Sequence, residues 1–359
     1  MNVFGGLEGG ASLSKIVLLS AEGHVLASDE SGPATNHWMI GVDECFARIA
    51  RMVADALRMA ALPADTRLAA LGLCLSGCED EAANAEMAAQ FERRYPSVAR
   101  ACVVASDTLG SLLTATPSGG VVLIAGTGSN CLLFNPDQSH VKCGGWGHVL
   151  GDWGAAFQIA NEAIKTVIEV EENFRREEHD VSGVRDVVFR HFSVHKTSEL
   201  LTPIYAHFDK TSFAALCRPL ALRESFPSIN SVYCLLSPAV AVEKDDPLAK
   251  ALFRRAAVDL AKHVNAVLPS AHPSLLSLPG GLPVVCVGSV FKSWPLLRDG
   301  FFATLSPTIR ELSLRRLTTS SSFGAAFLAS KLNAQTMRMH FDANSELLDR
   351  FSRQQYEKR

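Results

Sequence analysis

The sequence predicts an α/β fold built from two similar domains. The chain has 359 residues, which is more than one compact core usually supports. Strand-sized apolar segments alternate with segments of helical periodicity up to residue 117, and the same order begins again after Gly119 and Gly120. Strands that alternate with helices favour a parallel sheet covered by helices. We therefore expect one domain at 1–117, a second at 118–335, and a helical tail at 336–359 that packs back on the first domain.

The first half of the chain predicts a hairpin-rich start followed by helix and strand in alternation. VFGGLEGG, SKIVLLS and HVLASD are apolar segments separated by a glycine-rich loop and by a turn at Glu22 and Gly23. Apolar residues recur at the spacing of an amphipathic helix from 42 to 57. The segments 68–76 and 101–105 predict buried strands, and the Ala- and Glu-rich segment 79–95 between them predicts a helix.

The second half repeats this order with longer helical segments. GVVLIAGTGSNCLLFN predicts two strands joined by a glycine turn, and most of 154–270 has a helical pattern. The segment 282–291 predicts a buried strand, and 320–332 predicts a helix whose small residues permit close approach of a strand or a ligand. The segment 223–240 interrupts the helical pattern with prolines and serines, so we interpret it as an insertion.

Composition and charge exclude several classes of protein. The chain is 48% hydrophobic and 20% charged, and its 34 basic and 37 acidic residues give a net charge of -3. Such a balance provides no overall field that would recruit nucleic acid or an anionic membrane. The N-terminus shows no signal-peptide pattern, and nine cysteines without a repeated framework favour a reducing compartment. We expect a cytoplasmic protein with neither a nucleic-acid nor a membrane partner.

Two glycine-rich hairpin tips are candidate phosphate sites. The first contains Gly9, Gly10 and Ser12, and the second runs from Gly126 to Asn130. Backbone N–H groups at such tips can converge on phosphate oxygens. Each tip taken singly is also typical of an ordinary tight turn, and neither is a P-loop or a dinucleotide fingerprint. One tip per half predicts a nucleotide phosphate held between two domains.

Two carboxylates lie beside these tips. Asp107 follows a buried strand, at the sheet edge where open α/β sheets place their ligands, and could accept a proton from an attacking hydroxyl. Its alternative role is the N-cap of the next helix. Glu8, within the first tip, could organise a hydrated Mg²⁺ near the phosphates or could simply be a solvated loop charge.

The segment 143–157 has five glycines and two tryptophans, which indicates a special backbone shape. In this segment Trp146 could stack on a sugar, and His148 and Asp152 could bind hydroxyl groups. The alternatives are core packing for Trp146 and His148 and helix capping for Asp152. Asn36, in a polar and aromatic patch before a helix, is likewise either a cap or a ligand contact.

The motifs together resemble a known family of kinases. GGLEGGASLSK, TNHWMIGVDEC, ASDTLGS, ATPSGGVVLIAGTGSNC, CGGWGHVLGDWG, HFDKTSFAALCR and VGSVFKSWPLL are similar to the eukaryotic N-acetylglucosamine kinases, in the ATPase group related to BadF-type activators. The resemblance implies two ribonuclease H-like domains of the actin and hexokinase type with a cleft between them. It also implies ATP and Mg²⁺ as cofactors, N-acetylglucosamine 6-phosphate as the product in amino-sugar salvage, and a cytoplasmic homodimer.

The resemblance assigns roles to individual positions. Asp107 would deprotonate the C6 hydroxyl, and Glu8 is the candidate for Mg²⁺. The implied sugar contacts are Asn36, Asp107, Ser129, Asn130, Gly145, Trp146, Gly147, Asp152 and Ala156. The implied nucleotide contacts, with the glycines of the first tip included, are Gly9, Gly10, Ser12, Thr127, Ala214, Ser289 and Ser293.

The sequence also departs from the family pattern. Ala11 and Ser12 stand where the family has glycine and threonine, a change that we expect the tip to tolerate if the φ angle of Ala11 is negative. Leu132 replaces an arginine and Trp153 an acidic residue, and the insertion at 223–240 has no counterpart. These departures leave two alternatives open: a kinase for N-acetylmannosamine, another hexosamine or a hexose, and a sugar-binding homologue with impaired catalysis.

Overall fold

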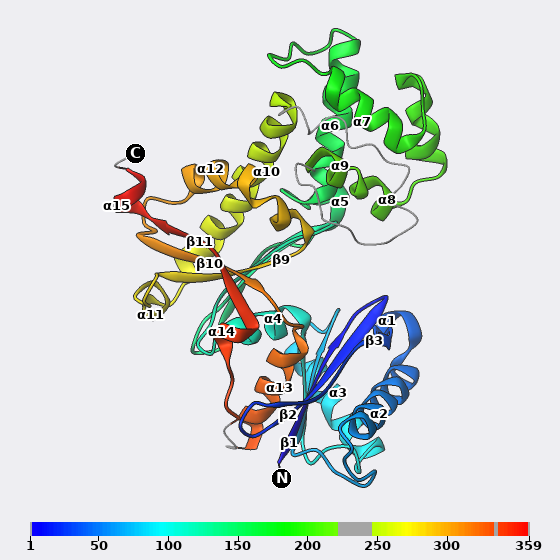
Figure 1. The fold of residues 1–359 in the computed structure, drawn as a ribbon, viewed down its shortest axis with the longest axis vertical. Coiled ribbons are helices and arrows are strands. Elements are labelled where there is room, and N and C mark those ends of the chain that lie inside the picture. The colour runs from blue at the N-terminus through cyan, green and yellow to red at the C-terminus, as the bar shows by residue number, and fades with distance from the viewer. Residues whose placement is uncertain (1, 222–245, 334–336, 358–359) are drawn as a thin grey trace.

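The computed structural model describes residues 2–221, 246–333 and 337–357, which form two lobes stacked along the long axis (Figure 1). The insertion expected at 223–240 lies outside the described residues. Each lobe is built on one mixed β-sheet, because each begins with a hairpin of antiparallel strands and continues with parallel strands. Within the described ranges, no helix is both long and apolar enough to cross a membrane.

The first sheet has the strand order β3-β2-β1-β4-β5. Its strands are β1 (Val3–Gly9), β2 (Leu13–Ser20), β3 (Val25–Pro33), β4 (Ala70–Leu75) and β5 (Cys102–Ser106). One face is covered by α2 (Val42–Met59) and α3 (Glu81–Arg94), which bury the apolar stripes Phe46, Ile49 and Phe91 against Leu7 and Leu71. The short helix α1 (His37–Ile40) precedes α2.

The second sheet repeats the strand order of the first with one added strand, β11-β10-β9-β6-β7-β8. Its strands are β6 (Gly120–Ala125), β7 (Ser129–Phe134), β8 (His140–Gly144), β9 (Leu282–Val287), β10 (Glu311–Leu317) and β11 (Ser345–Ser352). The largest hydrophobic core joins one face of this sheet to the helices α6 (Ala156–Glu171), α10 (Pro247–Val267) and α12 (Trp294–Thr304). The repeated architecture predicted from the sequence is thus present.

The remaining helices of the second lobe are short or peripheral. They are α5 (Gly147–Leu150), α7 (Ser182–Phe192), α8 (Lys210–Ala215), α9 (Cys217–Ala221), α11 (Pro273–Leu276) and α15 (Arg353–Tyr356). Short 3-10 turns occupy Thr197–Leu200, Leu268–Ser270 and Ser289–Ser293, and a π turn occupies Thr202–Ala206. One more 3-10 turn, Lys331–Asn333, belongs to the first lobe.

Two helices form the junction between the lobes. Helix α4 (Asp107–Ala115) packs Leu112 and Ala115 against Val122 and Val285 of the second sheet. On its other side α4 crosses α13 (Ser322–Ser330), and a Cβ added to Gly324 would lie 1.9 Å from the carbonyl oxygen of the glycine at position 110. Only glycine permits so close a crossing. Because α4 contacts strands of both sheets, it connects the two lobes directly.

The C-terminal part of the chain departs from the predicted division. Helix α13, expected in the second domain, packs Ala326 and Ala329 on the free face of the first sheet, where Figure 1 shows it in orange among blue and cyan elements. The tail does return to the first lobe, since Met337 is buried there and the Arg338 amide donates to the Ala21 carbonyl. It then forms α14 (Phe341–Asn344) and β11, which pairs with β10 of the second sheet, in place of the expected helix.

Candidate active site

The first glycine tip joins β1 to β2. A Cβ on Gly9 would lie 2.4 Å from Thr35 Oγ1, and a Cβ on Gly10 would lie 2.7 Å from the Leu13 carbonyl oxygen, so close approach requires both glycines. The amide of Gly10 donates to Leu13, whereas the amides of the next two residues have no hydrogen-bond acceptor within the described part of the chain. Those residues, Ala11 and Ser12, are exposed, and neither has a positive φ. The expected tolerance of alanine is therefore confirmed, and this tip presents free N–H groups.

Asp107 is the first residue of α4, and its carboxylate is not the helix cap. Ser106 is the N-cap, since its hydroxyl accepts from the Leu109 amide at 3.3 Å. The Asp107 carboxylate accepts one side-chain hydrogen bond, from the Thr108 hydroxyl at 3.3 Å. Burial, and next the negative charge of Glu79, raise its pKa above the usual aspartate range. The capping alternative is wrong, and a carboxylate with a raised pKa is a better proton acceptor for a hydroxyl group.

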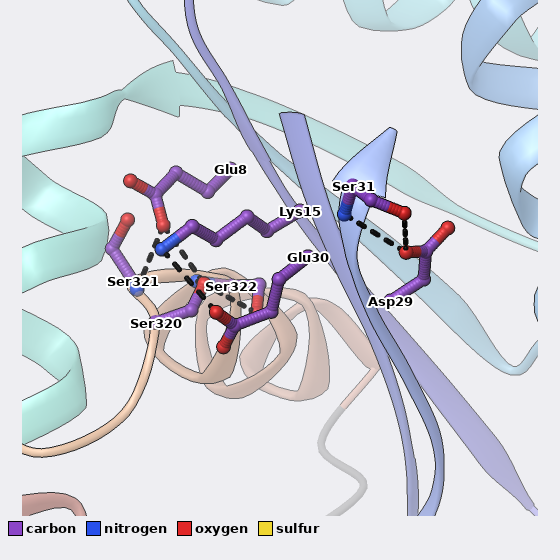
Figure 2. Close-up of polar contacts among 8 residues, drawn as sticks. All are labelled: Glu8, Lys15, Asp29, Glu30, Ser31, Ser320, Ser321 and Ser322. Carbon is purple, nitrogen blue, oxygen red and sulfur yellow. Dashed lines mark hydrogen bonds and ion pairs between the residues drawn. The ribbon is translucent and has the colours of Figure 1, made fainter. Parts of the chain in front are cut away.

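Glu8 lies on β1 with its carboxylate directed toward the start of α13 (Figure 2). Its Oε2 atom accepts from the Ser320 hydroxyl at 2.8 Å and from the Ser321 amide at 3.1 Å. These bonds use one carboxylate oxygen and leave Oε1 free to accept from metal-bound water, so the donor set fits a hydrated Mg²⁺. The described residues contain no group of three or more His, Cys, Asp or Glu side chains that could hold a metal. Such a cation would take its other ligands from phosphates and water.

The second glycine tip joins β6 to β7 and contacts the start of α6. The carbonyls of Gly126 and Thr127 accept from the first two amides of α6, at 2.9 and 3.3 Å. The amides of Thr127 and Gly128 have no acceptor among the described residues, as at the first tip. A Cβ on Gly288 would lie 2.3 Å from the Ala125 carbonyl oxygen, so the turn that begins at Ser289 lies beside this tip. The structure therefore brings Thr127 and Ser289 into one region.

The glycine-rich segment after β8 packs on β7 and forms a platform, which we define as Ser129, Asn130, Gly145, Trp146 and Asp152. The Gly145 amide donates to the Ser129 carbonyl at 3.1 Å, and the Ser129 hydroxyl donates to the Trp153 carbonyl at 2.8 Å. The Asn130 side-chain oxygen accepts from the Cys131 amide at 2.9 Å, which leaves its NH₂ group available. Gly145 has φ +75, a backbone conformation that glycine adopts without strain. The platform thus gathers five of the predicted sugar contacts.

The aromatic residues of this segment separate into one exposed and one packed ring. Trp146 is 66% exposed, so the core-packing alternative is wrong for it and its indole is free to stack on a ligand. His148 follows Gly147, the first residue of α5, and its ring lies 4.8 Å from that of Phe157 and 5.4 Å from that of Phe208. His148 therefore packs within an aromatic cluster with Phe157 and Phe208.

Asp152 is held by two donors that the sequence pattern did not indicate. Its Oδ1 accepts from the Ser129 amide at 3.1 Å, and its Oδ2 accepts from Lys210 Nζ at 2.9 Å. The capping alternative is wrong here as well, because the N-cap of α6 is Ala155 and makes no side-chain hydrogen bond. Lys210 lies 58 residues away along the chain, and only the packing of α8 on α6 reveals it.

Other predicted contacts lie apart from the platform. Asn36 caps α1, with its side-chain oxygen accepting from the Trp38 amide at 3.0 Å, and its NH₂ group remains available. The side chains of Ala156 and Ala214 are buried in the core of the second lobe, so any ligand contact there would involve the backbone. Among the described residues, no hydrogen bond or ion pair joins Asn36 or Asp107 to the platform, which belongs to the other lobe.

Two departures from the family pattern have different surroundings. Leu132 is buried in β7, whereas Trp153 is 41% exposed with its ring 6.0 Å from that of His263. Leu132 is apolar and lies in the sheet, so it needs no charged partner there. The exposed indole of Trp153 lies directly after Asp152. The replacement at position 153 therefore changes the exposed surface directly after Asp152, whereas the replacement at position 132 lies in the interior of the second sheet.

Two curated proteins that are named as amino-sugar kinases are similar to this chain in sequence. A protein of Dictyostelium discoideum named N-acetyl-D-glucosamine kinase is 24% identical over 344 residues, which cover 91% of this chain and 97% of that protein. A protein of Clostridium acetobutylicum named N-acetylmuramic acid/N-acetylglucosamine kinase is 28% identical over 213 residues, or 58% of this chain. The latter match spans only 60% of the length of the Clostridium protein.

Similar solved structures show the fold of the chain, and a family model shows its family. A structure from Chromobacterium violaceum, provisionally named an N-acetylglucosamine kinase, is 22% identical with a TM-score of 0.62 and covers 91% of this chain and 99% of its own. A second, from Porphyromonas gingivalis and provisionally named likewise, is 16% identical with a TM-score of 0.58 and covers 91% and 97%. These likenesses confirm the predicted two-domain fold. Because residues 6–326 match its sequence profile, the chain belongs to the BadF/BadG/BcrA/BcrD ATPase family.

Proposed function

We propose that this protein is an ATP-dependent kinase that transfers a phosphoryl group to the C6 hydroxyl of N-acetylglucosamine. The observation that supports it most is the carboxylate of Asp107, which is half-buried, carries no cation partner in the described structure, and has a raised pKa. It begins α4, the helix that contacts both lobes. The names of the Dictyostelium and Clostridium relatives support the same acceptor.

The residues divide the reaction between the two lobes. The platform binds the sugar, with Trp146 against one face of the ring and the Asp152 carboxylate accepting from its hydroxyl groups. Asp107 then takes the proton from the C6 hydroxyl, the C6 oxygen attacks the γ-phosphorus, and the bond to the ADP oxygen breaks. The free amides of the two glycine tips donate to phosphate oxygens and stabilise the charge that develops during transfer.

The reaction requires Mg²⁺ in this proposal, because the phosphates of ATP carry negative charge that a cation neutralises. Glu8, fixed by Ser320 and Ser321, would hold Mg²⁺ through water at Oε1. Magnesium, when bound, neutralises charge on the phosphoryl group and aligns it for attack. We expect chelation of Mg²⁺ to abolish ADP release while sugar binding, measured by calorimetry, persists.

The test is coupled ADP release from Mg-ATP by the purified full-length chain. Parallel reactions contain N-acetylglucosamine, N-acetylmannosamine, glucose or no sugar, and the product is identified by phosphorus NMR. We expect release that depends on N-acetylglucosamine and a product phosphorylated at O6. Release with another sugar alone would reassign the acceptor. Sugar binding by a folded chain without any release would instead establish the binding-only alternative.

We also propose that the protein acts as a homodimer in the cytoplasm. The described cysteines are all unpaired and all but Cys143 are buried, which suits a reducing compartment. Light scattering coupled to gel filtration tests the dimer, and fluorescence microscopy of the tagged chain tests the location. A monomeric mass at micromolar concentration contradicts the proposed homodimer.

A further inference from the structure

Lys210 forms a partly buried ion pair with the sugar platform. Its Nζ atom lies 2.9 Å from Asp152 Oδ2, and the side chains are 34% and 4% exposed. Asp152 has φ +60, an uncommon backbone conformation for a residue with a side chain. A Cβ on Gly128 would lie 2.5 Å from Asp152 Oδ1, so this carboxylate packs directly against the second glycine tip. Asp152 therefore connects the platform to the candidate phosphate site.

The backbone around Lys210 is fixed by contacts on both sides. Asp209 caps α8, with its carboxylate accepting from the Ser212 amide at 2.6 Å. Phe208 lies 5.4 Å from the ring of His148, and Phe213 stacks on Phe157 at 4.6 Å. Lys210 thus reaches Asp152 from a rigid support, with the first residue of α8 placed at the side of the platform.

We propose that Lys210 is a positioning residue for the acceptor sugar, acting through Asp152. This inference rests on the proposed function. The Ser129 amide and the Lys210 ammonium each engage a different carboxylate oxygen, and two donors fix the rotation of the carboxylate. The lone pairs that remain then keep a fixed direction, in which they accept hydrogens from the hydroxyl groups of the sugar. Without Lys210 the buried carboxylate keeps one charged oxygen without a strong donor and turns away from this orientation.

The kinetic test compares Lys210→Met with the wild-type enzyme. Loss of a hydrogen bond to a charged group lowers affinity about 10- to 100-fold. We therefore expect the KM for the sugar to rise by about the same factor. The KM for ATP stays within about twofold, because Lys210 acts on the acceptor side. Lys210→Arg, which keeps the charge, restores most of the sugar affinity. Lys262→Met is the matched control, since Lys262 is itself exposed and forms an ion pair with Asp259 at 2.9 Å in the same lobe.

A double-variant cycle separates positioning from general stability. If Lys210 acts through Asp152, then adding Lys210→Met to Asp152→Asn causes no further loss of sugar affinity in calorimetry. The double variant removes both charges of the pair, so it provides a folded protein even where the single variant is unstable. Additive losses overturn the positioning role, and so does a sugar KM that Lys210→Met leaves unchanged. A raised KM for ATP alone also overturns it and assigns Lys210 to the phosphates. If the wild-type chain binds no amino sugar, the proposed function itself is refuted. Failure of the positioning role alone leaves wild-type sugar binding intact and shows only in the variants.

Discussion

Replacement of Asp107 by asparagine tests the proposed chemistry most directly. The carboxylate makes one side-chain hydrogen bond of 3.3 Å and does not cap α4, so an amide of the same shape fits without disturbing the helix. Loss of a general base lowers kcat by about 10²- to 10⁴-fold. At 1.36 kcal/mol per tenfold this corresponds to about 2.7–5.4 kcal/mol of transition-state stabilisation. We expect the KM for N-acetylglucosamine to change by less than about threefold, because the platform is intact.

The raised pKa of Asp107 also predicts how the stability of the fold depends on pH. A carboxyl group whose pKa is higher in the folded than in the unfolded state contributes stability that is lost as the pH rises through its folded pKa. Above that pH the partly buried charge destabilises the fold. We therefore expect Asp107→Asn to have an equal or higher Tm than wild type at neutral pH, and this advantage to disappear as the pH falls below the folded pKa of Asp107.

The assays are single-turnover and steady-state ADP release together with thermal unfolding across pH. Asp65→Asn is the control, because Asp65 is exposed in the same lobe and forms no ion pair among the described residues. It leaves both kcat and the pH dependence of Tm unchanged. Turnover within tenfold of wild type in Asp107→Asn refutes the base assignment. A lower Tm at neutral pH refutes the claim that this carboxylate is held at a cost to stability.

Three further variants examine the surroundings of the site. Glu79→Gln removes a negative charge that raises the pKa of Asp107, so the acid limb of the kcat/KM profile shifts to lower pH; a shift to higher pH contradicts this. Gly324→Val places a Cβ 1.9 Å from the Gly110 carbonyl oxygen and forces α4 from α13, which lowers the free energy of unfolding in urea by about 3 kcal/mol. Trp146→Ala raises the sugar KM about 3- to 10-fold without changing Tm, since the indole is exposed; an unchanged KM removes Trp146 from the sugar site.

Features encoded by short segments were predictable from the sequence. The strand from 282 and the hairpins at both glycine tips follow from apolar runs bounded by glycine, and the structure has them at the expected positions. Asp107 was identified as a candidate because it follows a buried strand, and that strand, β5, ends at Ser106. In each of these cases the signal and the structure lie within a few residues of each other.

Features that depend on distant packing were not predictable. The small residues of 320–332 indicated a close approach, but the same face fits either sheet, and only Gly6 and Gly72 of the first sheet leave room for it. The pairing of Lys210 with Asp152 has no local signal, because a lysine at the start of a helix is ordinarily solvated. The role of Ser320 in fixing Glu8 spans 312 residues and was likewise hidden.

The position of α13 has a consequence for the order in which the protein matures during translation. Phe4, Val17 and Leu19 are shielded by a helix that ends at residue 330. While the ribosome is still synthesising the second lobe, the first sheet has emerged with one apolar face bare. Chaperones that recognise exposed apolar surface can bind that face for most of the elongation time. The first sheet of this chain is therefore among the last parts to become native, although it is synthesised before the second lobe.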